Sequence, residues 1–292
     1  MKILVTGATG FVGGYLVPAL AVNHELHCLV RHTGEFPAAD GVNLIRADLK
    51  DSAFVDALPP RVDVIVHLAQ TNLQVPEHAN EVFQVNTVST QRLADYARTA
   101  GVSRFIFTSS GNVYRKSAAP FLESSQRDPR DFYALTKIFS EDLLKVYSDA
   151  FNSSVLRIFA PYGPGQTNRM IPKIISLVRD GKSVTLRNGG QPKINPIYID
   201  DLVEIIARCL TISGSYTVNV AGPETIDVKG IAMEAGRTFG CEPVFEHRDS
   251  PDMENLIAGT DKLAELFGME SMVDPPDGIA RTAMALRSNP LD

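Results

Sequence analysis

The sequence predicts an α/β fold in which a doubly wound parallel sheet is followed by a smaller C-terminal lobe. Three observations lead to this expectation. Strand-length apolar runs alternate with helical patterns through the first half of the 292-residue chain, a glycine-rich segment joins the first run to the first helix, and glycine and proline become frequent after Pro161. The alternation is typical of βαβ units, and the change in composition indicates a second lobe.

The first elements of the chain establish the expected sheet. Lys2–Thr6 is a continuous apolar run, which predicts a strand that is buried on both faces. Phe11–Val22 follows the glycine-rich segment with apolar residues at helical spacing, which predicts a helix. Further strands are expected over Glu25–Val30, Val42–Ala47 and Val62–Leu68, because these runs are short, apolar and rich in β-branched residues.

The later elements continue this pattern and then return to the main sheet. A long helical pattern covers roughly Asn80–Ala100. Because a helix and a strand near residues 200–220 fit the main sheet again, the sequence predicts a main domain over residues 1–165, with returns near 194–222, and a smaller discontinuous lobe over 166–292. The remaining expected elements are the strands Arg104–Thr108, Ser154–Phe159 and Tyr216–Val220 and the helices Asp131–Phe151 and Asp200–Thr211.

Composition and charge exclude several classes of partner. The chain has 28 Lys and Arg residues against 34 Asp and Glu residues, a net charge of -6 without a basic run, so nucleic acid is not an expected partner. The apolar runs are of strand length and the chain starts with its first strand, so no membrane partner is expected and the cytoplasm is the expected location. Three cysteines and six histidines without motif spacing favour a reducing compartment and no metal site.

A glycine-rich segment follows the first strand directly and is Thr6-Gly7-Ala8-Thr9-Gly10-Phe11-Val12-Gly13. Gly7 permits a tight turn, Gly10 lets the backbone approach a pyrophosphate, and Gly13 lets the helix pack closely on the strand. The helix N-terminus then faces the anion. The segment predicts a Rossmann-type dinucleotide site that Thr9, Phe11 and Val12 also contact, and a glycine-rich turn with a purely structural role is the alternative.

The end of the second strand indicates which nicotinamide cofactor binds. An acidic residue there accepts hydrogen bonds from the ribose 2′-hydroxyl of NAD but repels the 2′-phosphate of NADP. The sequence has Arg31 at this point, and a guanidinium matches a phosphate. NADP is therefore expected, with NAD as the second choice and a solvated surface arginine as the alternative. Asp48, which precedes Leu49 after the third strand, is expected either to contact the adenine amino group or to cap a helix.

Two segments carry the candidate catalytic side chains. Tyr133 and Lys137 lie one helical turn apart in the expected helix. A lysine beside a tyrosine favours the phenolate, lowers the phenol pKa from about 10, and so lets the tyrosine exchange a proton with a hydroxyl or a ketone. This spacing alone is common by chance. Ser109 and Ser110 support it, because their strand ends where parallel sheets bind ligands.

With these segments in view, the sequence resembles the extended branch of the short-chain dehydrogenase/reductase family, which contains nucleotide-sugar epimerases, dehydratases and reductases. The resemblance runs from Lys2 to about Leu210 and is specific because many motifs occur together. The matching pieces are the glycine-rich segment, His67-Leu68-Ala69, Asn86-Thr87, Ser109-Ser110, Tyr133 with Lys137, Pro161-Tyr162-Gly163-Pro164-Gly165 and Tyr198-Ile199-Asp200-Asp201.

The resemblance implies a role for each matched residue. It implies that Tyr133 is the acid/base, that Lys137 orients the nicotinamide ribose and tunes Tyr133, and that Ser110 hydrogen-bonds to the reacting oxygen. It also implies that Leu68 and Ala69 line the cofactor groove and that residues around Pro161–Gly163 contact the nicotinamide amide. Leu49, next to Asp48, is expected to contact the cofactor as well. A homodimer is expected through the helices near Asn80–Ala100 and Asp131–Phe151.

Departures from the family pattern restrict the expected activity. Dehydratases have Asp and Glu after the catalytic Ser or Thr, where this chain has Gly111 and Asn112, so dehydratase activity is not expected. Epimerases often have an arginine for the diphosphate where this chain has Ile194-Asn195-Pro196, and a second one near 251–255, a stretch that is acidic here. Arg157 is expected to be structural. The candidate substitutes for the missing arginines are Arg169, Lys173, Lys193 and Arg187.

The sequence therefore supports three functional hypotheses. The first is an NADP-dependent oxidoreductase, specifically a 4-ketoreductase of a nucleotide-activated sugar, because Arg31 suits a dissociable NADPH. The second is a nucleotide-sugar 4-epimerase that uses NAD or NADP. The third is a non-catalytic nucleotide-binding member of the fold, which would be expected to lack part of the Ser110, Tyr133 and Lys137 set; all three are present.

Overall fold

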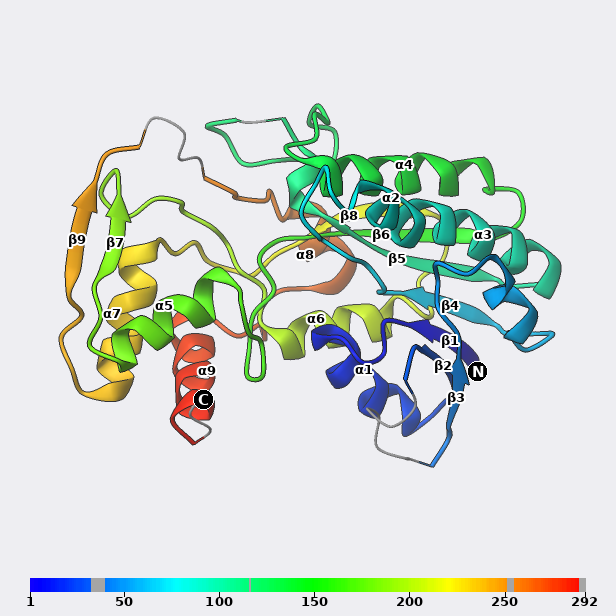
Figure 1. Cartoon of the computed structure of the whole chain (residues 1–292), viewed down its shortest axis with the longest axis horizontal. Coiled ribbons are helices and arrows are strands. Elements are labelled where there is room, and N and C mark those ends of the chain that lie inside the picture. Colours follow the sequence, from blue (N-terminus) through cyan, green and yellow to red (C-terminus); the bar gives the residue numbers. More distant parts are fainter. Residues whose placement is uncertain (33–39, 116, 251–254, 289–292) are drawn as a thin grey trace. The chain divides into compact units, whose positions relative to one another are not determined.

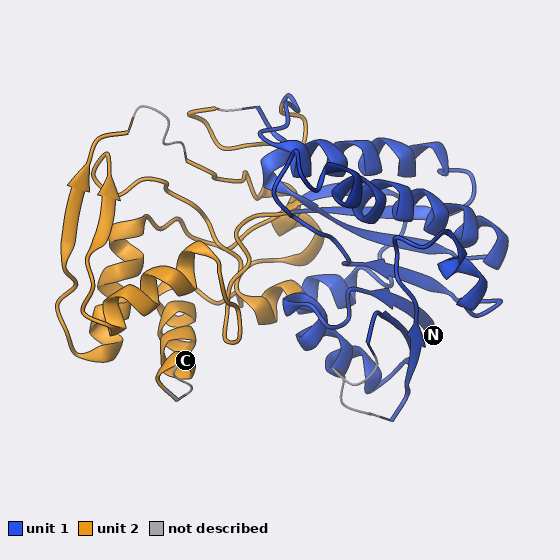
Figure 2. Cartoon of the chain, viewed as in Figure 1, with its two compact units in different colours: residues 1–115, 126–157, 203–218 blue, residues 116–125, 158–202, 219–292 orange. Residues whose placement is uncertain are grey.

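The computed structural model describes residues 1–292 except 33–39, 116, 251–254 and 289–292. Contacts divide the chain into two compact units, which Figure 2 shows in different colours. The predicted border at residue 165 lies inside unit 2, and the predicted return near 194–222 is divided between the units. Unit 1 comprises Met1–Arg115, Gln126–Arg157 and Val203–Val218, and unit 2 comprises Lys116–Ser125, Ile158–Leu202 and Asn219–Asp292.

A seven-stranded sheet has the strand order β3-β2-β1-β4-β5-β6-β8. The pairs β1–β2, β1–β4, β2–β3 and β4–β5 are parallel, which confirms the predicted α/β class. The strand order reverses direction between β1 and β4, and open α/β sheets bind ligands at the carboxyl ends of the strands at such a point. The strands are β1 (Lys2–Thr6), β2 (Glu25–Val30), β3 (Val42–Arg46), β4 (Val64–His67), β5 (Arg104–Ser110), β6 (Asn152–Ile158) and β8 (Tyr216–Val220).

Helices cover both faces of this sheet. Figure 1 shows α2, α3 and α4 on one face and α1 on the other. The helix expected over Asn80–Ala100 is interrupted by a π-helical turn at Gln84–Val88. There the Ser89 and Thr90 hydroxyls donate to backbone carbonyls four residues earlier, and such bonds compete with the helix's own. The bounds are α1 (Phe11–Ala21), α2 (Ala79–Phe83), α3 (Ser89–Ala100) and α4 (Phe132–Val146).

The strand interiors are buried because helices lie on both faces. Ile3, Leu4 and Val5 of β1 are 0% exposed. The Phe105 ring of β5 stacks on Phe151 with 5.6 Å between ring centroids. A sheet that is buried on both faces requires continuous apolar runs rather than alternating ones. The same runs made these strands predictable from the sequence.

Unit 2 contains elements that the sequence analysis did not predict. β7 (Val184–Arg187) pairs in parallel with β9 (Phe245–Arg248), and each is only four residues long. A periodic pattern is not recognisable over so short a run. The helices α5, α7 and α9 pack against one another. The helices after β6 are α5 (Met170–Arg179), α6 (Ile199–Arg208), α7 (Val228–Phe239), α8 (Asp261–Phe267) and α9 (Pro275–Ser288).

Two kinds of feature are absent from the part of the chain that the structure describes. None of the helices described is both long enough and apolar enough to cross a membrane. The same residues contain no group of three or more His, Cys, Asp or Glu side chains that could hold a metal ion.

The thiols of Cys28 and Cys209 are buried, that of Cys241 is exposed, and none of the three forms a disulfide.

Candidate active site

The glycine-rich segment holds the carboxyl end of β1 tightly against the start of α1. Gly7 has a φ of +74°, and a Cβ atom there would lie 2.7 Å from the amide nitrogen of Ala69. A Cβ atom on Gly13 would lie 2.2 Å from the carbonyl oxygen of Gly7. Both approaches are too close for any side chain. Gly7 and Gly13 are therefore required for the tight turn and for the close packing of helix on strand.

The N-terminus of α1 has no side-chain cap at the position expected for a pyrophosphate. Gly10 is exposed and is the N-cap residue, and no side chain bonds to the amides there. The first amides of a helix have no partner within the helix, so an anion is favoured at this end. The uncapped helix N-terminus after the glycine-rich turn therefore fits the pyrophosphate of a dinucleotide. Thr9 is exposed and Phe11 and Val12 are half-buried; their contacts with a cofactor stay predictions.

The residues expected around the adenosine lie at the carboxyl ends of β2 and β3. Arg31 is exposed and directly follows β2. Asp48 accepts a hydrogen bond from the backbone N–H of Lys50 at 2.9 Å, while the cap of the next 3-10 helix, Ser52–Ala57, is Asp51. Leu49 is 6% exposed and packs in the core, so only its backbone is available to a cofactor.

A buried histidine connects β1, β4 and α3 behind the glycine-rich segment. The Thr90 hydroxyl donates to the Asn86 carbonyl at 2.8 Å, so its oxygen accepts from Nε2–H of His67, 3.0 Å away. Nδ1 of His67 then accepts from the Thr6 hydroxyl, 2.6 Å away. Thr6 Oγ1 in turn accepts from the Ala69 N–H at 3.2 Å. This chain of donors and acceptors assigns the proton of His67 to Nε2.

The neutral ring of His67 keeps the loop after β4 in place. Burial, with a smaller effect of the Lys137 charge, lowers the pKa of His67 to about 3. Leu68 donates its N–H to the Thr6 carbonyl at 3.2 Å, and Ala69 lies against Gly7. The two predicted groove residues are thus held beside the glycine-rich segment, where a dinucleotide is expected.

α4 carries Tyr133 and Lys137 one turn apart. Asp131 caps this helix by accepting from a backbone N–H at 2.7 Å. Lys137 is 0% exposed, its Nζ donates to the Thr108 carbonyl at 2.8 Å, and the same atom lies 5.6 Å from the centroid of the Tyr133 ring. Burial lowers the pKa of Lys137 to about 7, while the Glu141 charge acts to raise it. The structure therefore brings the predicted phenol and ammonium together.

Ser110 ends β5, two residues after Thr108, whose carbonyl Lys137 contacts. Its Oγ accepts from the Asn112 N–H at 3.2 Å, so its hydroxyl proton is what Ser110 can offer to a substrate oxygen. The next residues, Gly111–Val113, form a 3-10 turn. Neither Gly111 nor Asn112 can exchange a proton with a sugar carbon, and the absence of dehydratase activity stays a prediction.

The structure adds Gln70, which the sequence analysis missed. The Tyr133 hydroxyl donates to Gln70 Oε1 at 2.6 Å, across 63 residues of sequence. Gln70 follows Leu68 and Ala69 in the loop after β4. A loop has no periodicity that predicts where a side chain points. Its place beside two predicted groove residues was the only signal that could have identified it.

A buried ion pair joins α4 to β6 near these side chains. Glu141, one turn after Lys137, is 1% exposed and accepts from Arg157 Nη2 at 2.6 Å and Nε at 3.0 Å. It also accepts from the Ser109 hydroxyl at 2.5 Å. Arg157 Nη1 donates to the Tyr114 hydroxyl at 2.7 Å. This network holds the end of β5 to α4, which is a structural role of the kind expected for Arg157.

Other predicted residues belong to unit 2. Pro161 accepts from Gln166 Nε2 at 2.7 Å through its carbonyl oxygen, and its contact with the nicotinamide stays a prediction. Asn195 is 4% exposed and bonds to both backbone groups of Ala258, at 2.9 and 3.0 Å. The amide side chain of Asn195 is therefore used in hydrogen bonds within the fold and does not serve a diphosphate. Residues 251–254 of the acidic stretch lie outside the described residues.

The four cations named as candidate diphosphate partners lie in different elements of unit 2. Arg169 is the N-cap of α5 and Lys173 lies in the first turns of that helix, and both are exposed. Arg187 ends β7, and Lys193 lies beyond it outside any helix. The N-terminus of a helix favours negative charge, and the role of each of the four cations toward a diphosphate stays a prediction.

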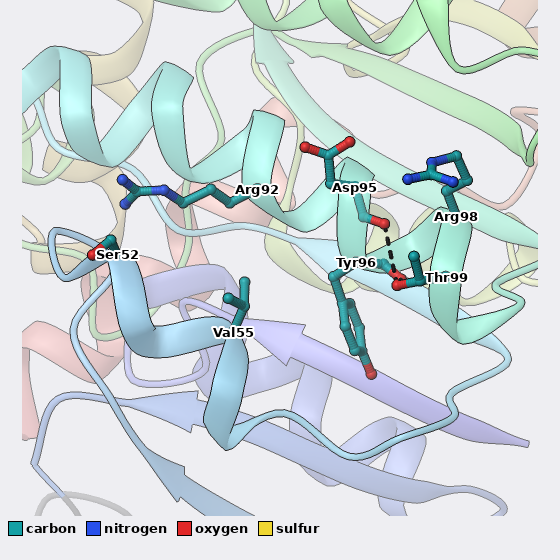
Figure 3. Close-up of a pocket in the computed structure, with 7 residues that line it drawn as sticks. All are labelled: Ser52, Val55, Arg92, Asp95, Tyr96, Arg98 and Thr99. Carbon is teal, nitrogen blue, oxygen red and sulfur yellow. Dashed lines mark hydrogen bonds between the residues drawn. The ribbon is translucent and has the colours of Figure 1, made fainter.

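One pocket of about 460 Å³ lies in unit 1 between the Ser52–Ala57 turn and α3. Figure 3 shows Arg92 and Arg98 at opposite ends of its lining, with Asp95 between them. None of the predicted cofactor or catalytic residues lines it, so it is not the candidate active site. The lining residues are Ser52, Val55, Arg92, Asp95, Tyr96, Arg98 and Thr99.

Known proteins of related sequence cover almost the whole chain. The model of the NAD dependent epimerase/dehydratase family matches residues 3–221. A dTDP-4-dehydro-6-deoxy-D-allose reductase from a Streptomyces species is 27% identical over 302 residues, which cover 93% of this chain and 90% of the relative. A UDP-glucose 4-epimerase from Mycolicibacterium smegmatis is 27% identical over 312 residues, which cover 99% of both chains.

Solved structures share the fold over the same extent. MoeE5 in complex with UDP-glucuronic acid and NAD has a TM-score of 0.87 and 25% identity, with 99% of both chains covered. The UDP-glucose 4-epimerase of Thermus thermophilus in complex with NAD has a TM-score of 0.83 and 24% identity, covering 99% of this chain and 100% of that one. These similarities confirm the predicted Rossmann-type fold.

Proposed function

The chain belongs to the NAD-dependent epimerase/dehydratase family, and from that premise we propose that it is an NADP-dependent 4-ketoreductase of a nucleotide-activated sugar. The observation that carries the proposal is that Ser110, Tyr133 and Lys137 all lie in unit 1, on β5 and α4. A relative of nearly the same length is a reductase of a dTDP-4-dehydro sugar. A non-catalytic member of the fold would not need all three side chains.

The residues of the chain account for the proton chemistry of such a reduction. A nicotinamide dinucleotide bound along the glycine-rich segment supplies the hydride. Tyr133 donates its phenolic proton to the carbonyl oxygen, and the Ser110 hydroxyl hydrogen-bonds to that oxygen. The Lys137 ammonium stabilises the phenolate that is left, because it lies 5.6 Å from the ring centroid in a buried position.

The solved relatives named above contain NAD. The proposed preference for NADP is therefore supported by Arg31 and not by these relatives. Arg31→Asp is expected to weaken NADPH binding roughly 10- to 100-fold and to invert the preference, since a charge-assisted bond to phosphate contributes about 1.5–3 kcal/mol. Fluorescence titration with NADPH and NADH measures both dissociation constants. Arg61→Asp, at an exposed position before β4, is the matched control. Equal binding of NADPH and NADH by the unmodified chain would contradict the assignment.

A 4-epimerase is the second candidate, since several relatives are epimerases. The two activities differ in the fate of the hydride, which an epimerase returns to the same sugar and a reductase delivers to a ketone from solution. With a 4-keto-6-deoxy nucleotide sugar we expect stoichiometric oxidation of NADPH, and deuterium from 4-labelled NADPH at C4 of the product. Interconversion of two 4-epimers without loss of NADPH would establish the epimerase instead.

The proposal includes three further features. Binding of the sugar diphosphate is assigned to Arg169 and Lys173, the exposed cations at the start of α5. A homodimer through α3 and α4 stays a prediction; Phe139 and Val146 are apolar side chains of α4 that are 44% and 82% exposed. A cytoplasmic location likewise stays a prediction.

A further inference from the structure

We propose that Gln70 is a positioning residue that holds the phenol of Tyr133 in its protonated form and so prepares the site to receive a ketone rather than an alcohol. The inference deepens the proposed function and rests on it for the role of Tyr133 as proton donor. It concerns a side chain outside the predicted catalytic set. Its basis is the contact between the two residues and the way the loop around Gln70 is anchored.

The contact itself favours one protonation state. Tyr133 donates its hydroxyl proton to Gln70 Oε1 at 2.6 Å. With its oxygen turned to the phenol, as in the structure, the Gln70 amide can accept from the neutral phenol but has no proton to donate to a phenolate; only its NH2 group could do that, after the amide had rotated. A hydrogen bond made only to the neutral form disfavours the charged form. Gln70 therefore opposes loss of the Tyr133 proton.

The backbone on both sides of Gln70 is anchored. Before it, the Ala69 N–H donates to Thr6 Oγ1 at 3.2 Å. After it, the Thr71 N–H donates to Asn86 Oδ1 at 2.8 Å, and Asn86 Nδ2 donates back to the Thr71 carbonyl at 2.9 Å. The side chain of Gln70 is exposed, but it extends from a loop whose neighbouring residues are tied to β1 and to the π-helical turn.

The same anchor reaches the helix that carries the phenol. Asn86 Nδ2 also lies 3.1 Å from Thr136 Oγ1, to which it donates. The Thr136 hydroxyl donates to the Tyr133 carbonyl at 2.7 Å. One buried amide side chain thus links the residue after Gln70 to the turn of α4 that holds Tyr133. This arrangement positions the backbone of Gln70 relative to the turn of α4 that carries Tyr133, from which the two side chains meet at 2.6 Å.

The charged groups nearby act in the opposite sense to Gln70. The Lys137 ammonium on α4 favours the phenolate. Lys137 is itself influenced by Glu141, which raises its pKa, and it faces the neutral His67 of β4. Because burial places the pKa of Lys137 at about 7, its charge declines above neutral pH, and the support for the phenolate declines with it. Gln70 and Lys137 therefore act in opposite directions on the proton of Tyr133.

The two directions of the reaction need different forms of Tyr133. In reduction the carbonyl carbon gains a hydride from the reduced nicotinamide, the carbonyl oxygen gains the Tyr133 proton, and solvent then reprotonates the phenolate. In oxidation, which is also the first half of epimerisation, the phenolate must first take a proton from the sugar hydroxyl. A side chain that stabilises the phenol in the waiting site suits the reductive direction.

A titration of the chain without cofactor or substrate tests the inference. The ultraviolet absorbance of phenolate is followed with pH, and the curve of Tyr133→Phe is subtracted to isolate Tyr133 from the other tyrosines. Gln70→Met keeps the length of the side chain and removes the acceptor, and we expect the midpoint to fall by about 0.5 to 1 pH unit. Gln70→Glu places a negative acceptor there, and its midpoint is expected to rise.

Gln74→Met is the matched control, because it makes the same change at an exposed position of the same loop and is expected to leave the midpoint unchanged. Equal midpoints for Gln70→Met and Gln74→Met would overturn the inference. So would a rise with Gln70→Met, which would show that the amide donates to a phenolate. If the titration shifts as expected but no NADPH-linked reduction occurs, the proposed function is wrong while the role of Gln70 is upheld.

Discussion

Replacing Tyr133 by phenylalanine is expected to lower turnover by about 10²- to 10⁴-fold, the usual contribution of a positioned proton donor. Phenylalanine keeps the ring and removes only the hydroxyl, and with it the hydrogen bond to Gln70. The affinity for NADPH should therefore change little. Steady-state rates with a 4-keto nucleotide sugar and the dissociation constant for NADPH measure the two effects separately. Turnover that survives in Tyr133→Phe would contradict the mechanism.

Lys137→Met tests the second residue of the phenol–ammonium pair. The ammonium is buried, donates to Thr108 and lies beside the Tyr133 ring, so its loss is expected to reduce both turnover and cofactor affinity. Lys145→Met, at an exposed position on the same helix, is the control and is expected to affect neither. A Lys137→Met enzyme with normal cofactor affinity and a normal pH–rate profile would remove Lys137 from the mechanism.

Glu141→Leu is expected to lower the free energy of unfolding by about 3–5 kcal/mol, because it leaves the Arg157 guanidinium buried without its counter-ion. Glu141 and Arg157 side chains are 1% and 5% exposed in this pair, and the closest atoms are 2.6 Å apart. The Ser109 hydroxyl loses its acceptor as well. Urea unfolding followed by circular dichroism measures the change.

Asp142→Asn is the control for this stability prediction. Asp142 is the next residue of α4 and pairs with Arg127 and Lys145, but its side chain is 45% exposed. Exposed pairs contribute about 0–1 kcal/mol, so a small loss is expected. If Glu141→Leu costs no more than Asp142→Asn, the buried pair is not the stabilising contact proposed here.

The features that the sequence determined by itself are those encoded within a few consecutive residues. The strands of the main sheet are continuous apolar runs, because a parallel sheet is buried on both faces. Gly7 and Gly13 are six residues apart, in the turn after β1 and the first turn of α1, and Tyr133 and Lys137 stand within one helical turn, so chain geometry alone brings each pair together. Their chemistry could be inferred without knowing how the elements pack.

The tertiary structure decided what lies between elements that are distant in sequence. The contact of Tyr133 with Gln70 spans 63 residues, that of Ser109 with Glu141 spans 32, and that of Glu141 with Arg157 spans 16. No local periodicity relates such residues. They meet only because the strand order places the end of β4 and the end of β5 beside α4 and β6.

The two paired strands of unit 2 escaped prediction for a related reason. β7 and β9 are four residues each and are far apart in the sequence, with helices between them, so neither has enough residues to show a period. These segments are strands because they pair with each other, and not because their residues have a strong intrinsic preference for β-structure. The sequence therefore determined the glycine-rich turn and the phenol–ammonium pair, whereas packing decided which side chain meets the Tyr133 hydroxyl, because that contact depends on distances across the fold.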